Sequence, residues 1–440
     1  MKDRNCGGET YNKRRGIISG IDLWQFLYIA VIALFSYLLH DSPIVSFAIL
    51  AIMALPFYKH VEHFIAILFL VAPIAYFFSS SDEGVLSLYT VAILLLMARS
   101  LPQISFLKSK AFVIRLIFIG VLFASFFVSE FDSKRGLLGL LYIIVVSLFL
   151  SSIKGFDINN FTSAIIKGSC FMLFVYMVII FSTSPVMSIS DKLTISATVN
   201  SNTTGFAISQ LTVTIASAYL LLNKRTKSTL IFFIFSVLTL IVIGSTNALL
   251  AAVLTILTVS LIDAHRKGKA GKRMIALAIV AALSIVTLDI FVGDIIFAKY
   301  NIAYIIESGG TNRVNVWSKI IPYVYNEYRW LGYGPSKGIT TTVLQSLVGR
   351  SYSHAHNSLV EVFCETGLIG LSVFIILLVV TFKNVIEASR KNENNYIVLA
   401  LLFGVFFAGL GESYFNDIVL WLIIGISNRC DLTKTEGVYE

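Results

Sequence analysis

The feature that most constrains this chain is a series of apolar runs that repeats from end to end, each close to the length of a membrane-crossing helix. A helix needs about 20 residues to cross the hydrocarbon core, where its backbone must bond internally. The chain is 57% hydrophobic and 13% charged, with a mean hydropathy of +0.83. One soluble core cannot bury that much apolar surface. We therefore expect an all-α, polytopic membrane protein.

Hydropathy predicts about 12 to 14 spans, because the shorter runs also suit re-entrant or half-buried segments. The candidates are Asp22 to Leu39, Ile44 to Phe57, Phe64 to Phe78, Val85 to Ala98, Phe112 to Val128, Leu137 to Leu150, Ile165 to Phe181, Gly205 to Leu222, Leu230 to Gly244, Ala248 to Ile262, Met274 to Val292, Leu368 to Phe382, Tyr396 to Leu410 and Phe415 to Ile426.

Basic residues orient these spans. Lys and Arg gather in both tails and in every second connection, for example Asp263 to Arg273, and the positive-inside rule places such segments in the cytoplasm. Both termini are then cytoplasmic, and the first span is its own targeting signal because no cleavage site follows the basic start. Topology explains most of the net charge of +9, so a nucleic-acid partner has no support beyond charge.

Two groups of residues have plainer interpretations. The four cysteines are scattered through tails and spans, which supports neither a disulfide framework nor a metal cluster. Arg115 and Lys167 fall in or beside spans, and we expect them to snorkel towards the cytoplasm. The alternative is a functional role, since charge inside a membrane often marks one.

One outside connection, residues 293–366, is much longer than the usual link between helices. It divides the chain into spans with short loops (1–292), a large periplasmic loop (293–366), and terminal spans with a cytoplasmic tail (367–440). The loop is cationic. A long loop can escape the charge rule without having a function, whereas arginines in a partly desolvated cleft suit a phosphate or diphosphate. Its cations are Lys299, Arg313, Lys319, Arg329, Lys337 and Arg350.

Within this loop, residues 309–334 predict an amphipathic helix that lies on the membrane surface or folds over a cavity. The expected apolar stripe is Trp317, Ile320, Ile321, Val324 and Tyr328, and Pro322 should bend the helix. Arg313 stands in the first turn, where the helix dipole favours an anion. An anion shared by Arg313 and the helix start would explain this placement.

The loop closes on "SYSHAHNSLVEVFCETGLIGL", in which His354 and His356 are two residues apart. A metal site with Glu361 or Glu365 is one alternative, and solvated histidines without chemistry are another. The Asn that follows His356, the nine residues up to Gly367 and the Gly-x-x-Gly start of the next span make a chemical role more attractive.

These residues resemble the O-antigen ligases and the related O-antigen and capsule polymerases. The shared signature matches as His356, Asn357, nine residues, then "GLIG" at Gly367 to Gly370, and "TNRVNVW" and "WLGYGPSKG" match the upstream motifs. The resemblance implies a lipid-sugar glycosyltransferase (GT-C) fold in the bacterial inner membrane. It also implies transfer of an undecaprenyl-diphosphate-linked glycan at the periplasmic face, with no metal, cofactor or nucleotide sugar.

By the same resemblance, His356 is the essential histidine and Arg313 engages the diphosphate. The family's Ser-Arg pair in a mid-chain span appears here as "GSTNALLAA", with Asn247 in place of the arginine. Cations on the outer side that could replace it are Arg135, Lys192, Arg329, Lys337 and Arg350. We also include His354 and Asn357 among the candidate substrate-binding residues.

Three hypotheses remain, and the acceptor separates the first two. A polymerase passes the glycan to the next lipid-linked repeat unit, whereas a ligase passes it to lipid A-core. The missing Ser-Arg pair favours the polymerase, for which a chain-length regulator is a candidate partner. A lipid-linked sugar transporter or flippase is the alternative from another class, but we see no internal repeat and no polar groups at mid-membrane in both halves.

Overall fold

The part of the chain described by the computed structural model is helical throughout and contains no β-strand. It comprises residues 61–71, 97, 109–129, 134–153, 156–182, 206–223, 226–243, 245–266, 313–335, 343–348 and 355–429. The helices are α3 (Val61–Val71), α5 (Lys110–Val128), α6 (Lys134–Ser152), α7 (Ile158–Ser182), α9 (Phe206–Asn223), α10 (Lys227–Ile243), α11 (Thr246–Arg266), α14 (Arg313–Glu327), α15 (Leu344–Val348), α16 (Ser358–Lys391), α17 (Asn395–Gly411) and α18 (Ile418–Ser427).

Three described helices are long and apolar enough to cross a membrane, at Lys110–Val128, Asn247–His265 and Ser358–Lys391. The all-helical polytopic membrane fold expected from the sequence is therefore confirmed. Predicted spans from Phe112 onwards coincide with α5, α6, α7, α9, α10, α11, α16, α17 and α18, except the one at Met274 to Val292. That span, the first two, nearly all of the fourth and both chain termini lie outside the described residues.

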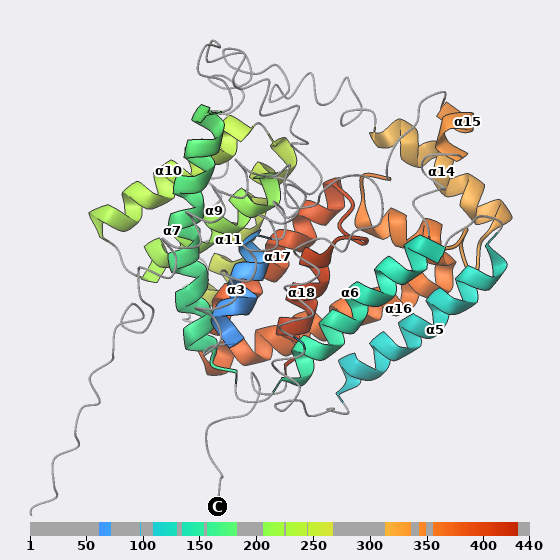
Figure 1. Ribbon diagram of the computed structural model, residues 1–440, viewed down its shortest axis with the longest axis horizontal. Helices are drawn as coiled ribbons and strands as arrows, with labels where there is room; N and C mark the ends of the chain where they lie inside the picture. Colours follow the sequence, from blue (N-terminus) through green and yellow to red (C-terminus); the bar gives the residue numbers. More distant parts are fainter. Residues whose placement is uncertain are drawn as a thin grey trace, which may run out of the picture.

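Aromatic packing holds the centre of the bundle together. Phe118 of α5, Phe374 of α16, Phe415 and Trp421 lie with ring centroids 5.7 to 6.2 Å apart. Trp421 belongs to α18, which has only 10 residues and is enclosed by its neighbours from Val419 to its end (Figure 1). A helix of 10 residues is too short to cross the hydrocarbon alone. Its apolar composition, which led to its prediction as a span, also fits its burial inside the bundle.

The expectation that Arg115 snorkels is wrong. Its side chain is fully buried between α5 and α6, and it donates to Ser147 O at 2.7 Å and Ser151 Oγ at 3.0 Å. Arg429 donates to two further carbonyls at the same end of α6. Carbonyls at a helix C-terminus lack intrahelical donors, so Arg429 caps α6, while Arg115 bonds to Ser147 and Ser151 in its last turns. Both arginines are buried. Lys167 is half-buried in α7.

Helix α16 breaks at Gly367, and this break organises the outer end of the bundle. Gly367 has φ 65° and ψ −165°, so the ladder of helix hydrogen bonds is interrupted there. The turn that follows α14, around Gly332, fills the gap. Backbone hydrogen bonds join the two segments: Tyr333 N to Cys364 O (2.8 Å), Gly334 N to Glu365 O (3.2 Å), Leu368 N to Arg329 O (2.9 Å) and Ile369 N to Trp330 O (3.2 Å).

The break divides α16 into a spanning part and an outer part. Residues 368–391 measure about 36 Å, enough to cross the hydrocarbon. Ser358 to Thr366 therefore form a helical extension beyond the span, at the end where His356 lies. The nine residues between Asn357 and Gly367 are thus helix instead of loop. Their number sets the separation between the helix start that carries Asn357 and the break.

We predict that Gly367→Ala destabilises the protein by about 2 kcal/mol or more, because an alanine there would be strained and crowded. A Cβ on Gly367 would lie 2.4 Å from the Trp330 carbonyl carbon, at a positive φ. Gly139→Ala is the matched control, since a Cβ in that exposed helical position meets nothing within 4 Å. It should change stability by no more than about 1 kcal/mol. Thermal unfolding in detergent measures both, and equal melting temperatures would contradict the role of the break.

Candidate functional site

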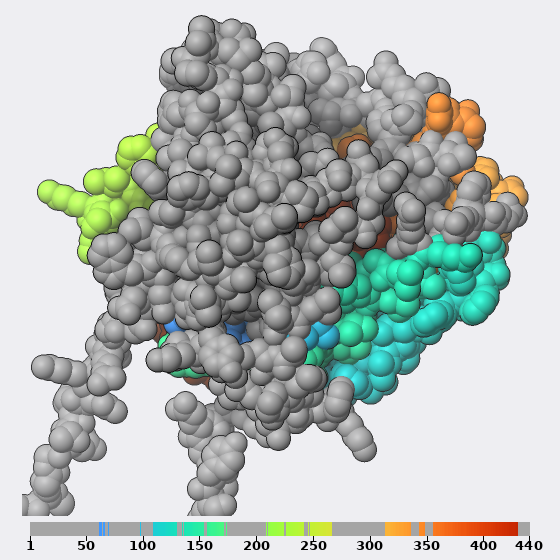
Figure 2. Space-filling model, viewed as in Figure 1, coloured from blue at the N-terminus to red at the C-terminus, as the bar shows by residue number. Residues whose placement is uncertain are grey.

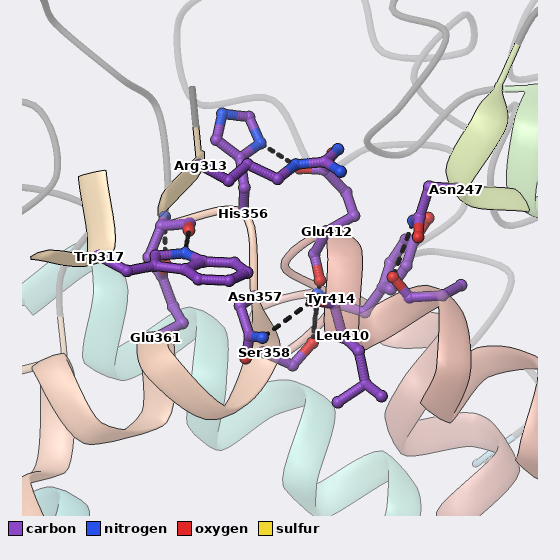
Figure 3. A network of polar contacts seen from close by, with 12 residues as sticks. Asn247, Arg313, Trp317, His356, Asn357, Ser358, Glu361, Leu410, Glu412 and Tyr414 are labelled. Atoms are coloured by element: carbon purple, nitrogen blue, oxygen red, sulfur yellow. Dashed lines mark hydrogen bonds and ion pairs between the residues drawn. The ribbon is translucent and has the colours of Figure 1, made fainter. Parts of the chain in front are cut away.

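The predicted loop helix exists as α14, Arg313–Glu327, and continues through Pro322. Its buried stripe is Val316, Ile320 and Val324, which packs against α15 and the outer part of α16. Trp317 is half-buried, but Ile321 is 38% exposed, so the predicted stripe was wrong at that position. The helix folds over the bundle, and its amino end lies at the loop that carries His356 (Figure 3).

Arg313 begins α14 and faces Glu412, which lies directly after α17. Its Nη2 atom is 3.6 Å from Glu412 Oε2, and the two side chains are 19% and 0% exposed. Burial lowers the pKa of Arg313, while Glu412 and Tyr414 raise it. Arginine stays protonated under these influences, so the pair is a guanidinium beside a buried carboxylate. A guanidinium has five N–H donors, so Arg313 could bind an anion in addition to this contact.

His356 lies beside the same carboxylate. Its Nδ1 is 2.9 Å from Glu412 Oε1, and the imidazole is 24% exposed. An ionised carboxylate accepts hydrogen bonds only, so Nδ1 is the donor in this contact, and in the neutral tautomer that makes this contact Nε2 has the lone pair. His356 also has φ 54°, the only positive φ at a non-glycine residue in the described chain. Such strain persists when neighbouring contacts enforce it, and it clusters at functional sites.

The residue before His356 is held from two sides. Trp317 Nε1 donates to Ala355 O at 2.7 Å, and Ala355 N donates to Glu361 Oε2 at 2.7 Å. Arg313 and Trp317 are four residues apart, so both project from one face of α14. One helix face therefore contacts both the backbone before His356 and the carboxylate beside its ring.

Asn357 joins the histidine loop to the segment that carries Glu412. Its Oδ1 caps α16 by accepting from Leu359 N at 2.9 Å and Val360 N at 3.1 Å. Its Nδ2 donates to Leu410 O at 2.8 Å. Next to it, Ser358 Oγ accepts from Tyr414 N at 2.9 Å. The two ends of the segment from Leu410 to Tyr414 are thereby held, with Glu412 between them.

Tyr414 is buried beneath this segment. Burial raises the pKa of its phenol well above the usual value, Glu412 and Asp417 raise it further, and Arg313 opposes them. The phenol therefore stays protonated. It adds no negative charge near Glu412.

Asn247 lies near the site without touching His356 or Arg313 through any described contact (Figure 3). Its Nδ2 donates to Ala408 O at 2.8 Å, and a Cβ on Gly411 would lie 2.2 Å from its Oδ1. The side chain thus holds the end of α17 immediately before Glu412. At the position where the resemblance implies an arginine, Asn247 therefore supports the backbone.

The other candidate residues are not gathered at this cluster. Arg329 is exposed beyond the far end of α14, where its Nε donates to Tyr325 O at 3.3 Å; the helix measures about 22 Å. His354, Arg350, Lys337 and Lys192 lie outside the described residues, and the side chain of Arg135 is not described. Within the described ranges, no three His, Cys, Asp or Glu side chains come together as metal ligands would.

Sequence reasoning missed Glu412. It follows the apolar helix α17 directly and is fully buried, between two predicted spans. A carboxylate at the outer end of a span was the available signal, because a charge at such a boundary is costly unless a partner meets it. Glu361, considered only as a metal ligand, instead binds the backbone of the histidine loop.

We predict that Asn357→Asp and Asn357→Ala separate the two contacts of this side chain. Aspartate keeps the acceptor that caps α16 and loses the donor to Leu410, at about 1 kcal/mol. Alanine loses both contacts, at about 2 kcal/mol. Thermal unfolding in detergent measures the difference. If the two variants unfold at the same temperature, the cap contributes nothing.

Comparison with known proteins agrees with this geometry. Residues 231–375 match the family model described as O-antigen ligase, a stretch that contains Asn247, Arg313, His356 and the break at Gly367. Glu412 lies beyond the matched stretch. A comparison with curated proteins found no match. The matched stretch thus resembles the O-antigen ligases, which confirms over these residues the resemblance seen in the motifs.

Proposed function

We propose that this enzyme transfers a glycan from undecaprenyl diphosphate to a sugar hydroxyl at the periplasmic face of the inner membrane, without a metal ion or nucleotide sugar. The match to the O-antigen ligase family model supports a role in glycan ligation by a glycosyltransferase-like membrane enzyme. The observation that carries the finer proposal is the 2.9 Å contact between His356 Nδ1 and the buried Glu412, with Arg313 on the same carboxylate.

His356 acts as the general base in this proposal. Its Nε2 accepts the proton of the acceptor hydroxyl while the hydroxyl oxygen bonds to the anomeric carbon. The bond from that carbon to the diphosphate oxygen breaks, and the diphosphate leaves with the electron pair. Glu412 fixes the tautomer and offsets the charge of the imidazolium that forms, as a carboxylate does in hydrolase triads.

Arg313 binds the leaving diphosphate. A guanidinium keeps its charge and presents paired N–H groups that match phosphate oxygens. As the first residue of α14, Arg313 also stands where the positive end of the helix dipole favours an anion. Glu412 contacts both His356 and Arg313, so one carboxylate orients the base and the anion-binding group together.

We predict that His356→Ala lowers transfer by a factor on the order of 10³, because it removes the base. Glu412→Gln keeps the shape and loses the charge, and should lower transfer on the order of 10²-fold. Cells that make the corresponding surface glycan, displayed by gel, report the activity. Ser318→Ala, an exposed hydroxyl on α14, is the control with unchanged glycan. Normal long glycan made by stably expressed His356→Ala would refute the proposed base.

Between the two acceptors, we propose the lipid-linked repeat unit, which makes the enzyme a polymerase that would work with a chain-length regulator. The support is Asn247, which stands in place of the family's second arginine and bonds to α17. The description of the matching family favours the ligase reaction on lipid A-core, so ligase is the second candidate.

We predict that a deletion strain shows lipid A-core carrying one repeat unit, because a polymerase loss leaves the ligation step intact. Gel display of lipopolysaccharide or capsule measures this. Bare core with accumulated lipid-linked polymer would instead identify a ligase. Restoration by the wild-type chain is the control for both outcomes.

A further inference from the structure

Helix α14 carries a second apolar stripe that the fold leaves uncovered. Val314, Ile321 and Tyr325 are 56%, 38% and 46% exposed. At 100° per residue they lie within about 40° of one another on the helix, away from the buried stripe. Trp330, in the turn that follows, is 60% exposed. Uncovered large apolar side chains arranged on one face indicate a contact surface.

The position of this stripe relative to α5 indicates what it contacts. Ser125 Oγ in the last turns of α5 donates to Leu331 O at 2.6 Å, and a Cβ on Gly334 would lie 2.4 Å from Ser129 Oγ. Since α5 is a candidate span of 19 residues, its end marks the edge of the hydrocarbon. Trp330 therefore lies at that edge.

The neighbouring surface of α5 is apolar as well. Phe127 and Val128 are 79% and 50% exposed at the end of the span, as lipid-facing side chains are. The light orange of α14 reaches the molecular surface near the cyan and green of α5 and α6 (Figure 2). The stripe on α14 thus continues a surface that faces lipid.

A cation accompanies the aromatic side chains. The guanidinium of Arg329 stacks on the Tyr325 ring, with Cζ 4.5 Å from its centroid. Aromatic residues with polar edges collect at the headgroup level of membranes, and arginine pairs with phosphates there. This chemistry fits lipid headgroups better than it fits an uncharged glycan.

We propose that Val314, Ile321, Tyr325, Arg329 and Trp330 form a membrane-contact face that lays α14 along the headgroup layer of the outer leaflet. The buried stripe holds the helix to α16, and the exposed stripe holds it to lipid. This contact is independent of the proposed reaction. It fixes Arg313 at the depth of phosphates, where a lipid-linked diphosphate lies.

Tryptophan fluorescence of the full chain in proteoliposomes tests this proposal. The lipids are phosphatidylcholines brominated near the headgroup or near the chain ends, because bromine quenches indoles in contact with it. The emission of Trp330 is the difference between the wild-type chain and Trp330→Phe. It should be quenched about twofold more by the shallow bromines than by the deep ones, as expected of an interfacial indole. Trp317→Phe is the matched control, since its indole is bonded to Ala355 and its emission should resist both lipids. An unquenched Trp330 would overturn the proposal.

A second measurement does not depend on tryptophan. Ile321→Cys and Asn326→Cys place thiols on exposed positions of α14, about 140° apart around the helix. With a membrane-impermeant maleimide, the thiol at 321 should react about tenfold more slowly, because a thiol in apolar surroundings ionises poorly. Equal rates would overturn the membrane contact. A slow rate at 321 with an unquenched Trp330 would also overturn it, in favour of a glycan or a protein partner.

Discussion

The ion pair and hydrogen bond that converge on Glu412 bring together three parts of the chain. Arg313 comes from a helix outside the bundle, His356 from the start of α16, and Glu412 from the end of α17. Burying a carboxylate without partners would cost free energy. The folded chain therefore needs both contacts to Glu412, and these contacts also fix where Arg313 and His356 lie. Glu412 is fully enclosed while both partners stay partly open to solvent, so the imidazole and the guanidinium are the accessible groups of this cluster.

The break at Gly367 is what allows α14 to reach this carboxylate. The hydrogen bonds between the Gly332 turn and the break fix the carboxyl end of α14, and Trp317 fixes its amino half through Ala355. Between these two points lie nine helical residues of α16. The motif spacing from His356 to Gly367 can therefore be understood as a distance between two attachment points on one rigid segment.

Much of this could be predicted from sequence because it rests on local signals. Hydropathy runs predict spans, and His356, Asn357 and Gly367 stand in a short motif. The pairing of Glu412 with His356 could not be found in this way, because the two residues are 56 positions apart and meet only where α16 and α17 lie side by side. Arg115 was misjudged for the same reason: whether an arginine snorkels or caps a neighbouring helix depends on which carbonyls tertiary packing brings near.

Asn247 shows how one substitution can change the division of roles around the same carboxylate. A second arginine in its place would add a positive charge close to Glu412, where Arg313 already stands. Here the side-chain amide of Asn247 instead donates to Ala408 O and so holds the end of α17. The described part of the site therefore depends on Arg313 for its guanidinium, which the ion pair with Glu412 holds at the start of α14.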